Sequence, residues 1–102
     1  MSSADEPNPA GAADAITRVM KIVNEKGLHA RASAKFVQLV EKFDAKVVVS
    51  RAGESAGGDS IMGLMMLAAG PGTDIELRAS GPEAERAIGA LAELIAGGFD
   101  EK

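Results

Sequence analysis

The sequence contains no cysteine, tryptophan or tyrosine, and has only one histidine and three phenylalanines among its 102 residues. Without cysteine there is no disulfide framework and no thiolate metal site, and one imidazole alone cannot hold a transition metal. We therefore expect neither a metal nor a cofactor. Because aromatic residues are scarce, the core has to be built from aliphatic and methionine side chains.

Long hydrophobic runs are absent as well, since no stretch approaches the roughly 18 apolar residues of a membrane span. The first residues do not resemble a charged and then apolar secretion signal. Residues 1–15 mix small residues, prolines and acids without apolar periodicity, which predicts a disordered leader followed by one domain over residues 16–102. We expect a soluble, monomeric, cytoplasmic protein with no membrane partner.

Charge is distributed unevenly along the chain. The net charge is −4, yet residues 16–51 carry eight basic and three acidic side chains, a net of +5, whereas the rest carries three basic and twelve acidic ones, a net of −9. The histidine, His29, lies in the basic part. This pattern favours an acidic partner or an anionic group near His29; the alternative is an ordinary solvated mixture of surface charges.

Hydrophobic periodicity predicts four strands and three helices. In residues 73–80, for example, Ile75, Leu77 and Ala79 alternate with charged residues, as in a sheet that is covered on one side. The expected elements, in order, are a strand at 16–23, a helix at 30–43, a strand at 45–50, a short strand ending near 59, a helix at 61–69, a strand at 73–80 and a helix at 82–96. The predicted fold is α+β, an open-faced β-sandwich of order β-α-β-β-α-β-α, with a four-stranded antiparallel sheet and three helices on one face.

The segment Gly27-Leu28-His29-Ala30-Arg31 joins the first strand to the first helix. The first turn of a helix has unpaired backbone N–H groups and a positive partial charge, so it can bind an anion. A phosphoryl group on His29 would receive hydrogen bonds from the amides of Ala30 and Arg31 and from the Arg31 guanidinium. Gly27 permits a positive φ or a close backbone approach next to this phosphate-binding site.

A histidine suits a phosphoryl carrier because its neutral imidazole is nucleophilic near neutral pH, and the phosphoramidate retains enough transfer potential to pass the group on. Serine or threonine would trap the group. The alternative is structural: a lone histidine often caps a helix or fills an edge of the core.

Three strings, GLHARASAKF, DSIMGLMML and GPGTDIELRASGPEAERAI, resemble the histidine-containing phosphocarrier (HPr) family over residues 16–102. The resemblance implies a relay protein without turnover of its own, phosphorylated on Nδ1 of His29 with Arg31 contacting the phosphate. Many members have proline after this arginine, where this chain has Ala32. The strings GGFDEK, EKFDAKVVV and ARAS look more like the nitrogen-related (NPr) branch, which implies a nitrogen-type enzyme I as donor and a IIA protein as acceptor.

Ser60 directly precedes a short apolar segment and is a good N-cap for it. In some relatives the serine of an SIMG string is phosphorylated by a dedicated kinase, so the resemblance also implies regulation at Ser60 by an HPr kinase/phosphorylase. Plain capping is the alternative.

Ile61, Met62, Met65 and Met66 cannot all face the core from one short helix. Methionine is common at surfaces that bind several partners. We therefore predict a docking patch beside His29, the alternative being that these methionines pack on the sheet. The patch is formed by Ala34, Lys35, Ile61, Met62 and Met65.

Two other functions are alternatives to a phosphocarrier. One is a regulatory binding module, in which the phosphorylation state of His29 or Ser60 controls partner proteins. The other is nucleic-acid binding, which we do not expect because the chain is acidic and the open sheet face offers no stacking aromatics.

Overall fold

The computed structural model describes residues 15–101; the expected leader falls almost wholly in residues 1–14, which lie outside the described residues, as does Lys102. Four strands form one antiparallel sheet of order β2-β5-β3-β4. The elements are β2 (Ile16–Lys21), α1 (Ala30–Val40), β3 (Lys46–Arg51), β4 (Glu54–Gly57), α2 (Ile61–Met66), β5 (Asp74–Ser80), α3 (Ala84–Ala96) and the 3-10 helix η1 (Gly98–Asp100).

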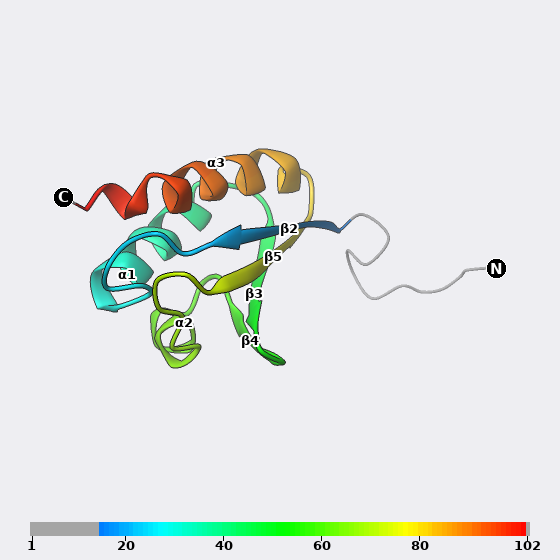
Figure 1. The fold of residues 1–102 in the computed structure, drawn as a ribbon. Coiled ribbons are helices and arrows are strands. Elements are labelled where there is room, and N and C mark those ends of the chain that lie inside the picture. Colours follow the sequence, from blue (N-terminus) through cyan, green and yellow to red (C-terminus); the bar gives the residue numbers. More distant parts are fainter. Residues whose placement is uncertain (1–14, 102) are drawn as a thin grey trace.

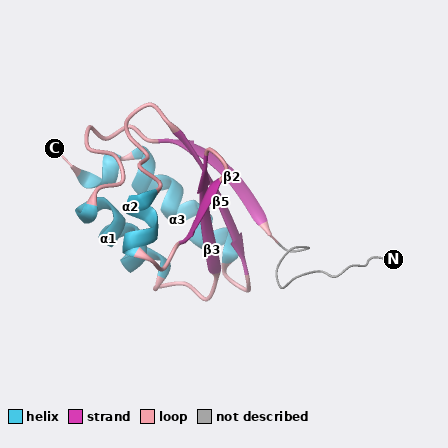
Figure 2. Ribbon diagram, turned by 90° about the horizontal axis from the view of Figure 1, so that it is seen from below, coloured by secondary structure: helices cyan, strands magenta, loops and turns pink. Residues whose placement is uncertain are grey.

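The helices α1, α2 and α3 cover the same face of the sheet, which confirms the predicted open-faced α+β sandwich (Figures 1 and 2). Alternation along the strands explains this arrangement: Ile75, Leu77 and Ala79 of β5 are buried under the helices, as are Val47 and Val49 of β3. From the helices, α1 contributes Phe36 and α3 contributes Leu91 and Ile95, all fully buried. The core is mainly aliphatic, with Phe36 and Phe99 also fully buried. The predicted contribution of methionine is wrong: among residues 15–101 no methionine is buried, and Met20 only packs against the core while partly buried.

Several predicted boundaries were wrong by two or three residues. The helix expected over residues 30–43 ends at Val40, because Lys42 and Phe43 donate to the carbonyls of Leu39 and Val40, each at 3.1 Å, and so close tight turns. The helix expected from Pro82 begins at Ala84, because Glu83 is paired with Asp44 through both its amide (3.0 Å) and its carboxylate (2.7 Å).

The other differences lie at element ends. The first strand stops at Lys21 instead of residue 23, and the second helix stops at Met66 instead of residue 69. Beyond α3, where no further element was predicted, the chain forms η1 and carries Phe99 back into the core. This return brings the C-terminal segment over the N-terminus of α1.

Candidate functional site

His29 occupies the N-cap position of α1 with an extended backbone (φ −77°, ψ −176°), and its carbonyl accepts from the amide of Ser33 at 2.9 Å. The next three amides, those of Ala30, Arg31 and Ala32, have no hydrogen-bond acceptor among residues 15–101. The His29 side chain makes no capping bond to them. A set of backbone donors therefore remains available beside the imidazole, as expected for an anion site.

Gly27 fixes the loop before His29. Its φ is +61°, and a Cβ at this position would lie 2.1 Å from the carbonyl oxygen of Ala69. The neighbouring amide of Leu28 donates to that same carbonyl at 3.0 Å. Both reasons offered for this glycine, a positive φ and a close backbone approach, therefore apply at once. The contact ties the His29 loop to the segment that follows α2.

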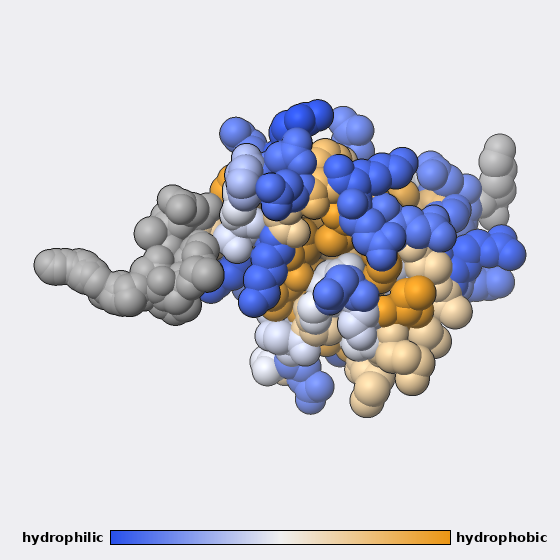
Figure 3. Space-filling model, turned by 180° about the vertical axis from the view of Figure 1, so that it is seen from behind, coloured by the Kyte–Doolittle hydropathy of each residue, from blue (hydrophilic) through white to orange (hydrophobic). Residues whose placement is uncertain are grey.

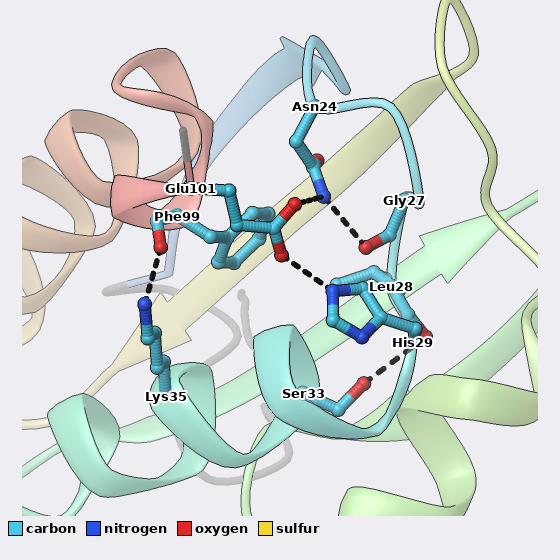
Figure 4. Close-up of polar contacts among 8 residues, drawn as sticks. All are labelled: Asn24, Gly27, Leu28, His29, Ser33, Lys35, Phe99 and Glu101. Atoms are coloured by element: carbon cyan, nitrogen blue, oxygen red, sulfur yellow. Dashed lines mark hydrogen bonds and ion pairs between the residues drawn. The ribbon is translucent and has the colours of Figure 1, made fainter.

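The C-terminal segment supplies a residue that sequence reasoning missed. Glu101 accepts a hydrogen bond from Nε2 of His29 through Oε2, and its Oε1 accepts from Nδ2 of the buried Asn24 at 3.2 Å (Figure 4). The imidazole is 28% exposed, and Glu101 lies against the Nε2 side of the ring.

Lys35 and Phe99 hold this segment in place. The Phe99 ring is completely buried in the core, and Nζ of Lys35, on α1, donates to the Phe99 carbonyl at 2.6 Å. Phe99 and Asp100 both have positive φ, +57° and +61°, which costs backbone energy in residues other than glycine. A buried ring and a charge-assisted hydrogen bond offset that cost, so Glu101 is delivered to His29 by a specific local fold.

The electrostatics of the pair depend on the ionisation of Glu101. The hydrogen bond from His29 lowers the pKa of this carboxyl from its ordinary value of 4.5, partial burial opposes that effect, and the hydrogen bond from Asn24 adds to it. The carboxyl is thus ionised at neutral pH and can only accept hydrogen bonds.

Arg31 projects from the first turn of α1 and is exposed. It makes no hydrogen bond or ion pair within residues 15–101, so its guanidinium is not engaged by the described part of the chain. It lines an open depression together with His29, Ala30, Lys35 and Glu101. Four of the predicted site residues, His29, Ala30, Arg31 and Lys35, thus border one hollow.

Ser60 is the N-cap of α2, and its Oγ accepts from the amide of Gly63 at 2.9 Å. The capping role is thereby established, and regulation at Ser60 stays a prediction.

The helix α2 has one buried residue, Leu64. Ile61, Met62, Met65 and Met66 are all exposed, Met62 at 68% and Met66 at 76%. Seen from behind, apolar atoms gather at the lower right of the molecule, where α2 lies (Figure 3). Ala34 and Lys35 of α1 are half-buried, and the Lys35 ammonium is occupied by Phe99.

A metal-binding cluster of three or more histidine, cysteine or acidic residues is not found within residues 15–101. Over the same range, no helix combines the length and apolarity needed to traverse a bilayer.

The geometry described above can be compared with known proteins. Residues 16–97 match the family model described as "PTS HPr component phosphorylation site". Phosphocarrier protein HPr of Cupriavidus necator is 48% identical over 86 residues, which cover 84% of this chain and 97% of that relative. Phosphocarrier protein HPr of Pseudomonas aeruginosa is 49% identical over 81 residues, covering 78% and 90%.

Solved structures agree with the sequence relatives. The crystal structure of HPr-C-His from Thermoanaerobacter tengcongensis superimposes with a TM-score of 0.81 at 38% identity, covering 85% of this chain and 98% of that one. HPr from Bacillus anthracis superimposes with a TM-score of 0.76 at 34% identity, covering 79% and 96%. A family model that spans nearly the whole described domain, together with relatives similar in sequence and in fold, places this chain in the HPr family as a phosphocarrier protein of the phosphotransferase system.

Proposed function

We propose that His29 is the phosphoryl-carrying residue, that it accepts the group from enzyme I of the nitrogen-related branch, and that it passes the group to a IIA protein. The observation that carries this proposal is the set of amides at Ala30, Arg31 and Ala32, which have no acceptor in the described part of the chain and lie directly beside the partly exposed imidazole. Backbone donors of this kind are oriented before the phosphate arrives, so they stabilise the charged group without reorganising.

Arg31 supports the same assignment. Its side chain is exposed and unengaged within residues 15–101, and it borders the hollow that contains His29. A guanidinium with free donors can make charge-assisted hydrogen bonds to the equatorial oxygens of a phosphoryl group during transfer. We therefore assign Arg31 to the phosphate rather than to the fold.

The partner surface is assigned to the exposed face of α2. Ile61, Met62 and Met65 present adaptable apolar side chains, and α2 packs against α1, whose first turn holds His29. Ala34 and Lys35 extend this surface along α1. A donor or acceptor that covers the patch would bring its own reactive histidine over the hollow.

The experiment is transfer of labelled phosphate from phosphoenolpyruvate through enzyme I to the wild-type chain and to His29→Ala. We expect labelling to be abolished in the variant while the circular dichroism spectrum and melting temperature stay close to wild type. Labelling of His29→Ala by enzyme I would exclude the assignment.

Branch membership requires a second measurement. Charging rates with nitrogen-type and sugar-type enzyme I are compared, followed by discharge to a nitrogen-type and a sugar-type IIA protein. We expect faster charging and discharge with the nitrogen-type partners. Equal rates, or a preference for the sugar-type partners, would contradict the branch assignment.

Ser60 supports a second candidate function, regulation by an HPr kinase/phosphorylase. Ser60 caps the helix that carries the exposed methionines, so a phosphate on its Oγ would remove the cap to Gly63 and add negative charge to the docking face. Label that enters from enzyme I but never leaves to any IIA protein would favour such a regulatory module over a relay.

A further inference from the structure

We propose that Glu101 is a positioning residue for phosphoryl transfer: its carboxylate holds the neutral His29 ring in the Nε2–H tautomer, which leaves the lone pair of Nδ1 as the nucleophile. This inference rests on the proposed function of His29. It adds a residue 72 positions away in the chain to the reacting group, and it assigns a role to the C-terminal segment.

The hydrogen bond between Nε2 of His29 and Oε2 of Glu101 determines which ring nitrogen carries the proton. In a neutral imidazole one ring nitrogen carries the proton and the other carries a lone pair. An ionised carboxylate has no proton to donate, so Nε2 has to be the donor in this contact. The lone pair then resides on Nδ1.

Asn24 fixes which carboxylate oxygen faces the ring. Its Nδ2 donates to the Gly27 carbonyl at 2.9 Å and to Oε1 of Glu101 at 3.2 Å. Rotation of the amide by half a turn would place its oxygen against these two oxygen acceptors, which excludes that orientation. Since Asn24 is buried, Oε1 is held by the amide and Oε2 remains for the imidazole.

The second ring nitrogen is available for reaction. Nδ1 makes no hydrogen bond within residues 15–101, and in Figure 4 no contact reaches it while Glu101 and Asn24 approach the ring from the other side. The backbone that precedes Glu101 is anchored by the buried Phe99 ring and by the hydrogen bond of 2.6 Å from Lys35 to the Phe99 carbonyl. The carboxylate is thus a fixed support behind the nucleophile.

The chemistry balances without any further reactant. In charging, the Nδ1 lone pair forms the new P–N bond as the donor's P–N bond breaks and its imidazole leaves with that electron pair. The Nε2 proton stays in place throughout, and the positive charge that develops on the His29 ring is stabilised by the carboxylate. In discharge the same proton ensures that the His29 ring leaves as neutral imidazole rather than as an anion.

The test compares Glu101→Gln, Glu101→Ala and Asp100→Asn in the full chain. In Glu101→Gln the new side-chain amide can lie in two orientations, and each disrupts one existing contact. In one orientation its NH2 group faces the Asn24 NH2 group; in the other it faces Nε2 of the ring and favours the Nδ1–H tautomer. The alanine side chain forms no hydrogen bond and therefore favours neither tautomer. Asp100→Asn is the matched control, because it removes the same charge from the adjacent exposed residue, whose side chain makes no hydrogen bond within residues 15–101.

Two readouts are taken: the tautomer, from ¹⁵N chemical shifts of labelled histidine at alkaline pH, and the single-turnover rate of charging by phosphorylated enzyme I. We expect the Nε2–H fraction and the rate to fall in the order wild type, Glu101→Ala, Glu101→Gln. The glutamine variant should be roughly 10- to 100-fold slower, a loss of the size caused by removing the hydrogen-bond partner that orients a metal-bound histidine. Asp100→Asn should match wild type in tautomer.

The result that would overturn the inference is a larger loss in Glu101→Ala than in Glu101→Gln, since a residue that only packs would behave in that way. Wild-type rate and tautomer in Glu101→Gln, or phosphate found on Nε2 of the wild-type ring, would overturn it too. Each of these results leaves His29 as the carrier. If the wild-type chain accepts no phosphate at all, the proposed function fails instead.

Discussion

The two sides of the His29 site are built in opposite ways. On the side of the C-terminal segment, Asn24 and His29 both donate to the carboxylate of Glu101, and the completely buried Phe99 anchors the backbone just before it. On the side of α2, the exposed methionines make no side-chain hydrogen bond within residues 15–101. A reacting group needs fixed geometry, whereas a surface for several partners needs adaptability. This difference supports the proposals that the first side serves the chemistry and the second side serves partner recognition.

The largest effect is expected from removing the anchor of the first side. Phe99→Ala should lower the free energy of unfolding by about 3–5 kcal/mol, because it empties a completely buried site. Met66→Ala, on the second side, should change it by no more than about 0.5 kcal/mol, since that side chain is 76% exposed. Urea denaturation of both variants measures the difference. Similar losses in the two would show that the sides are not built differently.

The second largest effect is expected from Arg31→Ala, on the rate of phosphoryl transfer. We expect charging to slow by roughly 10- to 100-fold, because a charge-assisted hydrogen bond to the phosphoryl group contributes about 1.5–3 kcal/mol. Stability should stay near that of wild type, since Arg31 is exposed and unengaged within residues 15–101. Arg78→Ala, an exposed arginine on β5, is the control. An equal rate loss in both variants would indicate general charge attraction instead of a phosphate contact.

The second side is tested by changing Met62 and Met65 together to glutamine. We expect the dissociation constant for enzyme I to rise about tenfold, which corresponds to about 1.4 kcal/mol, while stability and the His29 tautomer stay unchanged. Val19→Gln is the matched control, because Val19 is 59% exposed on β2 and lies outside the proposed patch. Unaltered binding of the double variant would remove α2 from the interface.

The smallest effect is a local one in acid. The pKa of Glu101 is lowered from 4.5 in the folded chain, chiefly by the His29 hydrogen bond, so its stabilising contribution is present above pH 4.5 and is lost as the pH falls through the lowered value. Hydrogen exchange of the Glu101 amide, which donates to Gly98, should accelerate in that range. The Met65 amide within α2 provides the reference. In Glu101→Gln the acid-dependent acceleration should disappear.

Much of the fold could be predicted from the sequence, because alternation in Asp74–Ser80 and the apolar stripe of α1 are local patterns. The errors occur where distant residues intervene. The start of α3 is set by Glu83 pairing with Asp44, 39 positions away, and no local rule indicates this pair. Pro82 alone predicted an earlier start.

Part of the site could be predicted from the sequence. Gly27, His29, Ala30 and Arg31 lie within one short segment, and a glycine before a helix start is a local signal. The role of Glu101 could not be predicted, because nothing in the spacing of residues 29 and 101 indicates that they are in contact. One signal was available: Phe99 is a large apolar residue between Gly97-Gly98 and a charged end, and burial of its ring requires the chain to turn back.

The fit of Gly27 against the Ala69 carbonyl has a kinetic consequence for a carrier. Because the loop already has its final conformation before a partner binds, association does not include the entropic cost of ordering that loop. Productive complexes can then be brief and still react. Short residence times allow one small protein to exchange rapidly between a donor and several acceptors.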